Sequence, residues 1–115
     1  MSVNKELLLV LKSSTLAEGE MDLGETMMER FLQMLLDSGE IPARIICMGT
    51  AVFLTTAGSR LNGVMKKFQT RGSEVLSCCT CLEYYGRMEK LVVGTPTNMK
   101  DTVSALLSFK KVINL

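Results

Sequence analysis

Three of the four cysteines in the chain lie within four positions, at Cys78, Cys79 and Cys81. A short apolar run typical of a strand ends just before them, and Thr80-x-x-Glu83 then matches a capping box, which marks a helix start. The pattern predicts Cys81 at the first helical position, with Cys78 and Cys79 in the loop before it. Backbone N–H groups and the helix dipole stabilise a thiolate there, so at least one thiol pKa should fall below about 8.5. We expect sulfur chemistry at this segment.

The spacing Cys78-x-x-Cys81 fits three kinds of site: a redox dithiol, half of a metal site, or a persulfide carrier with a second, resolving thiol. Zinc needs four ligands, no second paired motif exists, and Cys47 lies far away in an apolar run typical of the core. We therefore expect no metal. No nucleotide-binding glycine motif is present either, so no cofactor is expected.

Composition excludes several classes of function. The chain has no histidine, which rules out Ser-His-Asp and Cys-His catalysis and histidine metal ligands. A formal net charge of +1 without a basic patch argues against nucleic-acid binding. The apolar run at residues 7–11 is too short for a membrane span or a signal peptide, so we expect a cytoplasmic protein with reduced thiols. A hydrophobic fraction of 47% indicates apolar surface buried between subunits.

The elements that must position the thiols alternate between strands and helices. Strands are expected at residues 6–11, 44–48, 75–76, 91–93 and 112–115, and helices at about 22–37, 59–72, 81–86 and 99–108, with residues 51–56 ambiguous. The strands are continuously apolar rather than alternating, which predicts a parallel sheet with helices on both faces. In such sheets the sites lie outside the carboxyl ends of the strands. The loops at 12–21, 49–59, 78–81 and 94–98 therefore gather there, and their hydroxyl groups could line an anion or chalcogen pocket.

Three helices carry an apolar stripe that is expected to face the sheet. The first stripe consists of Leu23, Met27, Met28, Phe31, Leu32 and Leu35, the second helix has Leu61, Val64, Met65 and Phe68, and the last helix has Met99, Val103, Leu106 and Leu107.

The segment from Val75 to Gly86 also resembles a known family signature. Its sequence Val-Leu-Ser-Cys-Cys-Thr-Cys-Leu-Glu-Tyr-Tyr-Gly is similar to the Leu-Ser-Cys-Gly-Thr-Cys-Leu-x-Tyr-Tyr-Gly signature of the C-terminal DsrE-like domain in YedF-type selenium-metabolism proteins. These belong to the DsrE/DsrF-like sulfurtransferase family. The similarity covers almost the whole chain and includes Leu54-Thr55, Gly58-Ser59 and Val93-Gly94-x-x-Thr97-Asn98-Met99.

The resemblance implies one DsrE-like domain over residues 1–115, an α/β protein folded as a three-layer α/β/α sandwich with a mainly parallel five-stranded sheet, flavodoxin-like or DsrEFH-like. It implies a homo-oligomer that relays sulfur or selenium between donor and acceptor proteins, TusA-like proteins among them, by sulfurtransferase-like chemistry. In that family the persulfide cysteine ends the third strand at a fixed distance before a helical glycine. Counting back from Gly86 gives Cys78. The family's usual glycine between the cysteines is Cys79 here.

The two lines of reasoning favour different nucleophiles. The capping pattern favours Cys81, whereas the resemblance marks Cys78. We expect Cys78 to carry the persulfide, because a loop thiol at a strand end reaches a partner protein more easily, and Cys81 to be the resolving or assisting thiol. Two alternatives stay open: a non-catalytic interaction or regulatory subunit of the same fold, and a dithiol redox protein that cycles Cys78 with Cys81.

Overall fold

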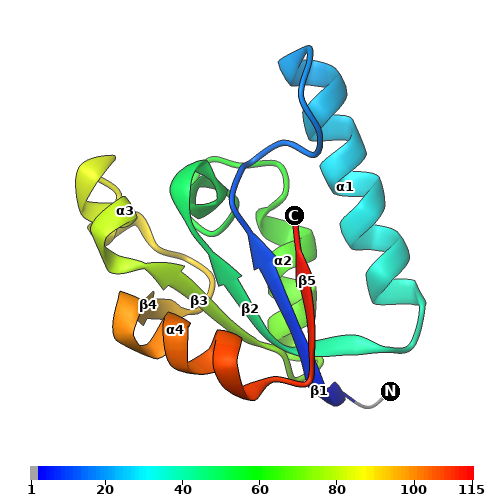
Figure 1. The fold of residues 1–115 in the computed structure, drawn as a ribbon. Coiled ribbons are helices and arrows are strands. Elements are labelled where there is room, and N and C mark those ends of the chain that lie inside the picture. The colour runs from blue at the N-terminus through cyan, green and yellow to red at the C-terminus, as the bar shows by residue number, and fades with distance from the viewer. Residues whose placement is uncertain (1–2) are drawn as a thin grey trace.

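A computed structural model describes residues 3–115 as a five-stranded parallel sheet between two layers of helices (Figure 1). The elements in chain order are β1 (Val3–Leu11), α1 (Met21–Asp37), β2 (Ile41–Cys47), the 3-10 helix η1 (Gly49–Leu54), α2 (Asn62–Thr70), β3 (Glu74–Cys78), α3 (Cys79–Tyr84), the 3-10 helix η2 (Met88–Lys90), β4 (Thr95–Thr97), α4 (Met99–Ser108) and β5 (Lys111–Asn114). The strand order is β4-β3-β2-β1-β5, and every pairing is parallel. The expected three-layer α/β/α sandwich is confirmed.

The second half of strand β1, which lies between β2 and β5, is buried on both faces of the sheet. Residues 7–11 are all buried, and Leu9 pairs with Ile45 of β2 on one side and with Ile113 of β5 on the other. Side chains alternate along the strand, so Leu9 joins the core under α1 and α2 while Leu8 joins the core under α4. Burial on both faces is what the continuous apolar run predicted.

The larger core lies between the sheet and helices α1 and α2. Its fully buried side chains include Met28 and Leu32 of α1 and Phe68 of α2. The predicted stripe of α1 is correct for Met28 and Leu32 but wrong for Leu23 and Met27, which are 56% and 37% exposed. The buried face instead continues to Leu36, a helical position four residues after Leu32.

Helix α4 covers the opposite face with its small residues. Thr102 and Ala105 face the sheet, and Asn98 caps the helix by accepting a hydrogen bond from the Asp101 amide at 2.8 Å. The predicted inward residues of this helix are wrong. Met99, Val103, Leu106 and Leu107 are 58%, 46%, 39% and 84% exposed, because the short side chains of Thr102 and Ala105 are the ones that pack close to the sheet.

The fourth strand lies later in the chain than predicted. Residues 91–93 form only an isolated antiparallel bridge from Leu91 to Thr56, and β4 is an edge strand that pairs with β3 through Thr95, Pro96 and Thr97. Gly94 permits this path, since its φ is +75° and a Cβ there would meet the carbonyl oxygen of Val75.

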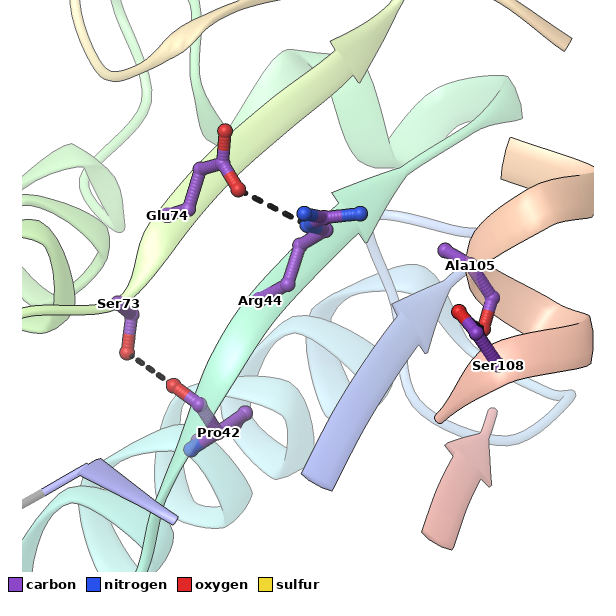
Figure 2. Close-up of polar contacts among 6 residues, drawn as sticks. All are labelled: Pro42, Arg44, Ser73, Glu74, Ala105 and Ser108. Atoms are coloured by element: carbon purple, nitrogen blue, oxygen red, sulfur yellow. Dashed lines mark hydrogen bonds and ion pairs between the residues drawn. The ribbon is translucent and has the colours of Figure 1, made fainter. Parts of the chain in front are cut away.

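Polar contacts join β2 and β3 near the starts of the two strands (Figure 2). The Ser73 hydroxyl donates to the Pro42 carbonyl at 2.7 Å, and Arg44 forms an ion pair with its strand neighbour Glu74 at 2.9 Å. Figure 2 shows this pair beside α4 rather than beneath it. A cleft of about 380 Å³ opens there between β3, β4 and α4.

Candidate functional site

The cysteine segment lies beyond the carboxyl end of β3, where α3 starts (Figure 1). Cys78 is the last strand residue and pairs with Thr97 of β4, and the helix begins at the next residue, Cys79. The predicted capping box is therefore wrong. Thr80 is the second helical residue rather than the cap, and Cys78 stands at the cap position with no side-chain capping bond. The helix begins two residues earlier than the pattern indicated, and no loop separates it from the strand.

The three clustered thiols differ in accessibility. Cys78 is only 5% exposed, whereas Cys79 and Cys81 are half-buried. Cys78 is thus neither a loop residue nor openly accessible, contrary to the reason for which it was expected to carry sulfur. Side-chain alternation puts Cys78 on the same face of β3 as Leu76, which packs on the α4 side of the sheet.

Cys81 connects α3 to the end of β2. The backbone amide of Gly49 donates a hydrogen bond to the Sγ of Cys81 at 3.2 Å, and Cys78 is the neighbouring thiol. Burial raises the pKa of the Cys81 thiol above its usual value, the Gly49 amide lowers it, and the neighbouring Cys78 raises it further. The predicted lowering by a helix start is wrong for Cys81, because burial and Cys78 together outweigh the one amide.

Gly49 can present its amide because of an unusual backbone. Its φ of +57° lies in the left-handed region, and a Cβ would stand 2.8 Å from the carbonyl oxygen of Lys12 at the end of β1. The adjacent Met48 amide donates to the Leu11 carbonyl at 2.9 Å, which holds the chain against β1. Sequence reasoning missed Gly49 as a site residue. The available signal was a glycine that directly follows a buried strand.

A buried hydroxyl pair fixes η1 against β3. The Oγ atoms of Thr55 and Ser77 lie 2.7 Å apart, and the Thr55 hydroxyl also donates to the Val52 carbonyl at 3.1 Å. Both residues are completely buried. Since Ser77 directly precedes Cys78 and η1 begins at Gly49, this pair sets the spacing between the two elements that carry the thiol site.

Two aromatic residues and one arginine pack η1 against the end of α3. The Phe53 ring lies 4.9 Å from the ring of Tyr85 at the end of α3, and the Arg87 guanidinium lies 5.0 Å above the Phe53 ring. Arg87 also donates from Nε to the Thr56 hydroxyl at 3.1 Å and from Nη2 to the Ala57 carbonyl at 2.7 Å. These contacts hold α3 and η1 together, and no motif in the sequence marks Arg87 as part of the site.

The remaining cysteine, Cys47, ends β2 in the core and is fully buried. Burial raises the pKa of its thiol to about 12. Within residues 3–115, no group of three or more Cys, Asp and Glu side chains is arranged to hold a metal ion. In the same part of the chain, no helix is long and apolar enough to cross a membrane.

The fold has solved counterparts. Over 96% of its length the chain superposes on 99% of the ychN protein from E. coli, with a TM-score of 0.72 and 16% identity. The chain therefore shares its fold with this protein. The conserved protein of unknown function BT1422 from Bacteroides thetaiotaomicron also matches, at a TM-score of 0.64 and 17% identity, with 96% of this chain and 95% of that one covered. No family model and no curated protein sequence matches the chain.

Proposed function

We propose that the protein relays sulfur, or selenium, between protein thiols and stores it as a persulfide on Cys78. The observation that supports this function is a pair of neighbouring thiols at the carboxyl end of β3, with Cys78 buried and Cys81 half-buried. A persulfide on Cys78 is shielded from reductants in solution, while Cys81 can meet a partner protein. The expected partners are donor and acceptor proteins of the cytoplasm, TusA-like proteins among them.

Two exchanges move the sulfur atom. The Cys81 thiolate attacks the terminal sulfur of a donor persulfide, so a new S–S bond forms on Cys81 and the donor leaves as a thiolate. The Cys78 thiolate then attacks that terminal sulfur, takes it, and returns Cys81 as a thiolate. Neither step needs an oxidant. The Gly49 amide stabilises the Cys81 thiolate that each exchange uses or releases, because a charged acceptor strengthens the hydrogen bond.

The test is intact mass after incubation with a low-molecular-weight persulfide, followed by peptide mapping. The wild-type chain should gain one sulfur atom that a reductant removes, located on Cys78. Cys81→Ser should load slowly and hold the sulfur longer, whereas Cys78→Ser should hold none stably. Cys47→Ser is the control and should load normally, although its buried hydroxyl destabilises the fold by about 1–3 kcal/mol. Stable sulfur on Cys81 in the Cys78→Ser variant would reverse the assignment.

The same pair of neighbouring thiols favours a second candidate function, a dithiol redox protein. Cys78 and Cys81 would form one S–S bond and give up two electrons and two protons to an oxidant. The mass experiment separates the two functions. Loss of two hydrogens under a mild oxidant, with no gain of sulfur from the persulfide, supports the redox protein. A chain that does neither supports a non-catalytic interaction or regulatory subunit.

We further infer that the protein forms a homo-oligomer through α4. Met99, Val103, Leu106 and Leu107 form an outward apolar stripe at helical spacing, and exposed apolar patches of roughly 300–600 Å² are often functional. A second copy fits this stripe, because in a two-fold contact the same surface supplies both sides and each apolar side chain meets another.

Sedimentation at low micromolar concentration tests this interface. Leu107→Glu should give a monomer with unchanged folding, since Leu107 is 84% exposed and contributes little to the core. Leu23→Glu is the matched control on α1, at 56% exposure, and should leave the oligomer intact. A wild-type monomer, or equal dissociation of both variants, would contradict the α4 interface.

A further inference from the structure

A cleft of about 520 Å³ lies at the carboxyl edge of the sheet and has no part in the proposed sulfur relay. The β1–α1 loop, the start of α1, η1, residues 58–61 and Arg87 line it, and none of the cysteines does. Thr50 of η1 faces the cleft, while the adjacent Gly49 binds Cys81. The cleft and the thiol site therefore lie against the same short helix.

Arg87 brings a fixed positive charge to this cleft. Its guanidinium is held by the Thr56 hydroxyl, the Ala57 carbonyl and the face of Phe53, all of which are neutral. Among residues 3–115, no Asp or Glu forms an ion pair with Arg87. A guanidinium that is already oriented loses little conformational freedom when it binds an anion, and its planar fork suits a carboxylate.

A second arginine, Arg60, also lines the cleft. Arg60 has only a long contact with Glu29 at 3.5 Å, and both side chains are about half exposed. Exposed pairs of this kind contribute little, so Arg60 is available to a ligand. Glu25 is the one acidic residue in the described lining, which therefore carries two positive charges and one negative charge.

Apolar side chains complete the walls. Phe53, Leu54 and Leu61 line the cleft together with Met21. Ligand sites commonly combine such walls with a few polar groups in a volume of roughly 300–1,000 Å³. We propose that this cleft binds a small organic anion, a carboxylate with a short apolar body, whose charge lies between Arg87 and Arg60 and whose body lies against Phe53 and Leu61.

The test is an NMR titration of the full ¹⁵N-labelled chain with sodium butyrate, against sodium chloride at equal ionic strength. Butyrate should shift the backbone amides of Thr50, Gly58 and Ser59 in a saturable way. Butyramide has nearly the same shape without the charge and should bind at least about tenfold more weakly, since hydrogen bonds to charged groups are the stronger ones. Shifts confined to other parts of the molecule, or equal binding of butyramide, would overturn the proposal.

Variants with matched charge changes complete the test. Arg60→Met and Arg87→Met should each weaken butyrate binding about tenfold or more. Lys66→Met removes one positive charge from the exposed face of α2 outside the cleft and should leave binding unchanged. If Arg87→Met fails to fold because it loses its contacts with Thr56 and Ala57, the Arg60→Met variant and the comparison with butyramide still test whether the cleft binds the carboxylate. Equal weakening by Lys66→Met would reduce the effect to net charge and refute the site.

Discussion

Replacing Gly49 with alanine should damage both the fold and the thiol site. The residue has φ +57°, and the new Cβ would meet the Lys12 carbonyl oxygen at 2.8 Å. Gly86 is the matched control, because its φ is +65° and a Cβ there would meet nothing within 4 Å. Both substitutions put an L-residue in the left-handed region, but only at Gly49 does the new Cβ press on another part of the backbone. The shift that relieves this contact displaces the Gly49 amide, which binds Cys81.

The expected magnitudes follow from these two contributions. The left-handed conformation costs an alanine roughly 1–2 kcal/mol at either position. At Gly49 the contact with Lys12 adds a packing cost of about 1–3 kcal/mol, because a backbone carbonyl directly after β1 cannot rotate away as a side chain would. Gly86→Ala should thus lower the free energy of unfolding by roughly 1–2 kcal/mol, and Gly49→Ala by roughly 2–5 kcal/mol.

Urea denaturation followed by circular dichroism measures the loss of stability. Iodoacetamide alkylation against pH, read by peptide mapping, measures the effect on Cys81. The Gly49 amide lowers the pKa of Cys81, so its displacement should move the alkylation midpoint to higher pH in Gly49→Ala and leave it unchanged in Gly86→Ala. Equal destabilisation of the two variants, or an unchanged Cys81 midpoint in Gly49→Ala, would refute the role assigned to Gly49.

Thr55→Val should lower the free energy of unfolding more than Ser77→Ala does. The first variant leaves the Ser77 hydroxyl buried without a partner, which costs about 1–3 kcal/mol. In the second variant, the Thr55 hydroxyl keeps its hydrogen bond to the Val52 carbonyl. Urea denaturation of both variants and the double variant tests this, and equal losses would contradict it. For Cys47, the pKa of about 12 means that unfolding releases its proton in alkaline solution, so stability should fall by up to about 1.4 kcal/mol per pH unit above pH of roughly 9. Cys47→Ala should flatten that decline; an unchanged slope would count against the raised pKa.

The sequence predicts a strand most accurately where the strand is buried on both faces, because burial there requires apolar side chains. The interior strand β1 needs apolar side chains on both faces, so its run of leucines identifies it. The edge strand β4 has only one neighbour and contains Thr95-Pro96-Thr97, which no hydrophobic pattern marks. The apolar residues 91–93 have the composition of a strand, but they lie in a connecting segment where Val93 is buried.

The sequence predicts which helices have an apolar face, but it does not predict whether that face packs on the sheet or points to solvent. In α4 the spacing of Val103, Leu106 and Leu107 is that of a real apolar face, and this face points to solvent. Periodicity reports that one side of a helix is apolar and does not say which layer covers it. The residue that faces the sheet, Ala105, is too small to dominate such a pattern.

The thiol cluster itself could be found from sequence, but its surroundings could not. Cys78 and Cys81 are close in the chain, so their spacing alone brings them together. The amide on Cys81 comes from Gly49, 32 residues earlier, and the pairing depends on how β2 and β3 align. Accessibility also depends on that alignment, which is why Cys78 proved buried.

Both margins of the sheet are poor templates for another chain. The three-residue β4 carries Pro96, which has no N–H to offer, and the four-residue β5 begins beside Lys110 and at Lys111. Short edges with proline or lysine oppose the strand-to-strand growth that leads to aggregates. Copies of this protein can therefore gather at high local concentration without extending the sheet, and an engineer who lengthened β4 or replaced Pro96 with valine would remove that protection.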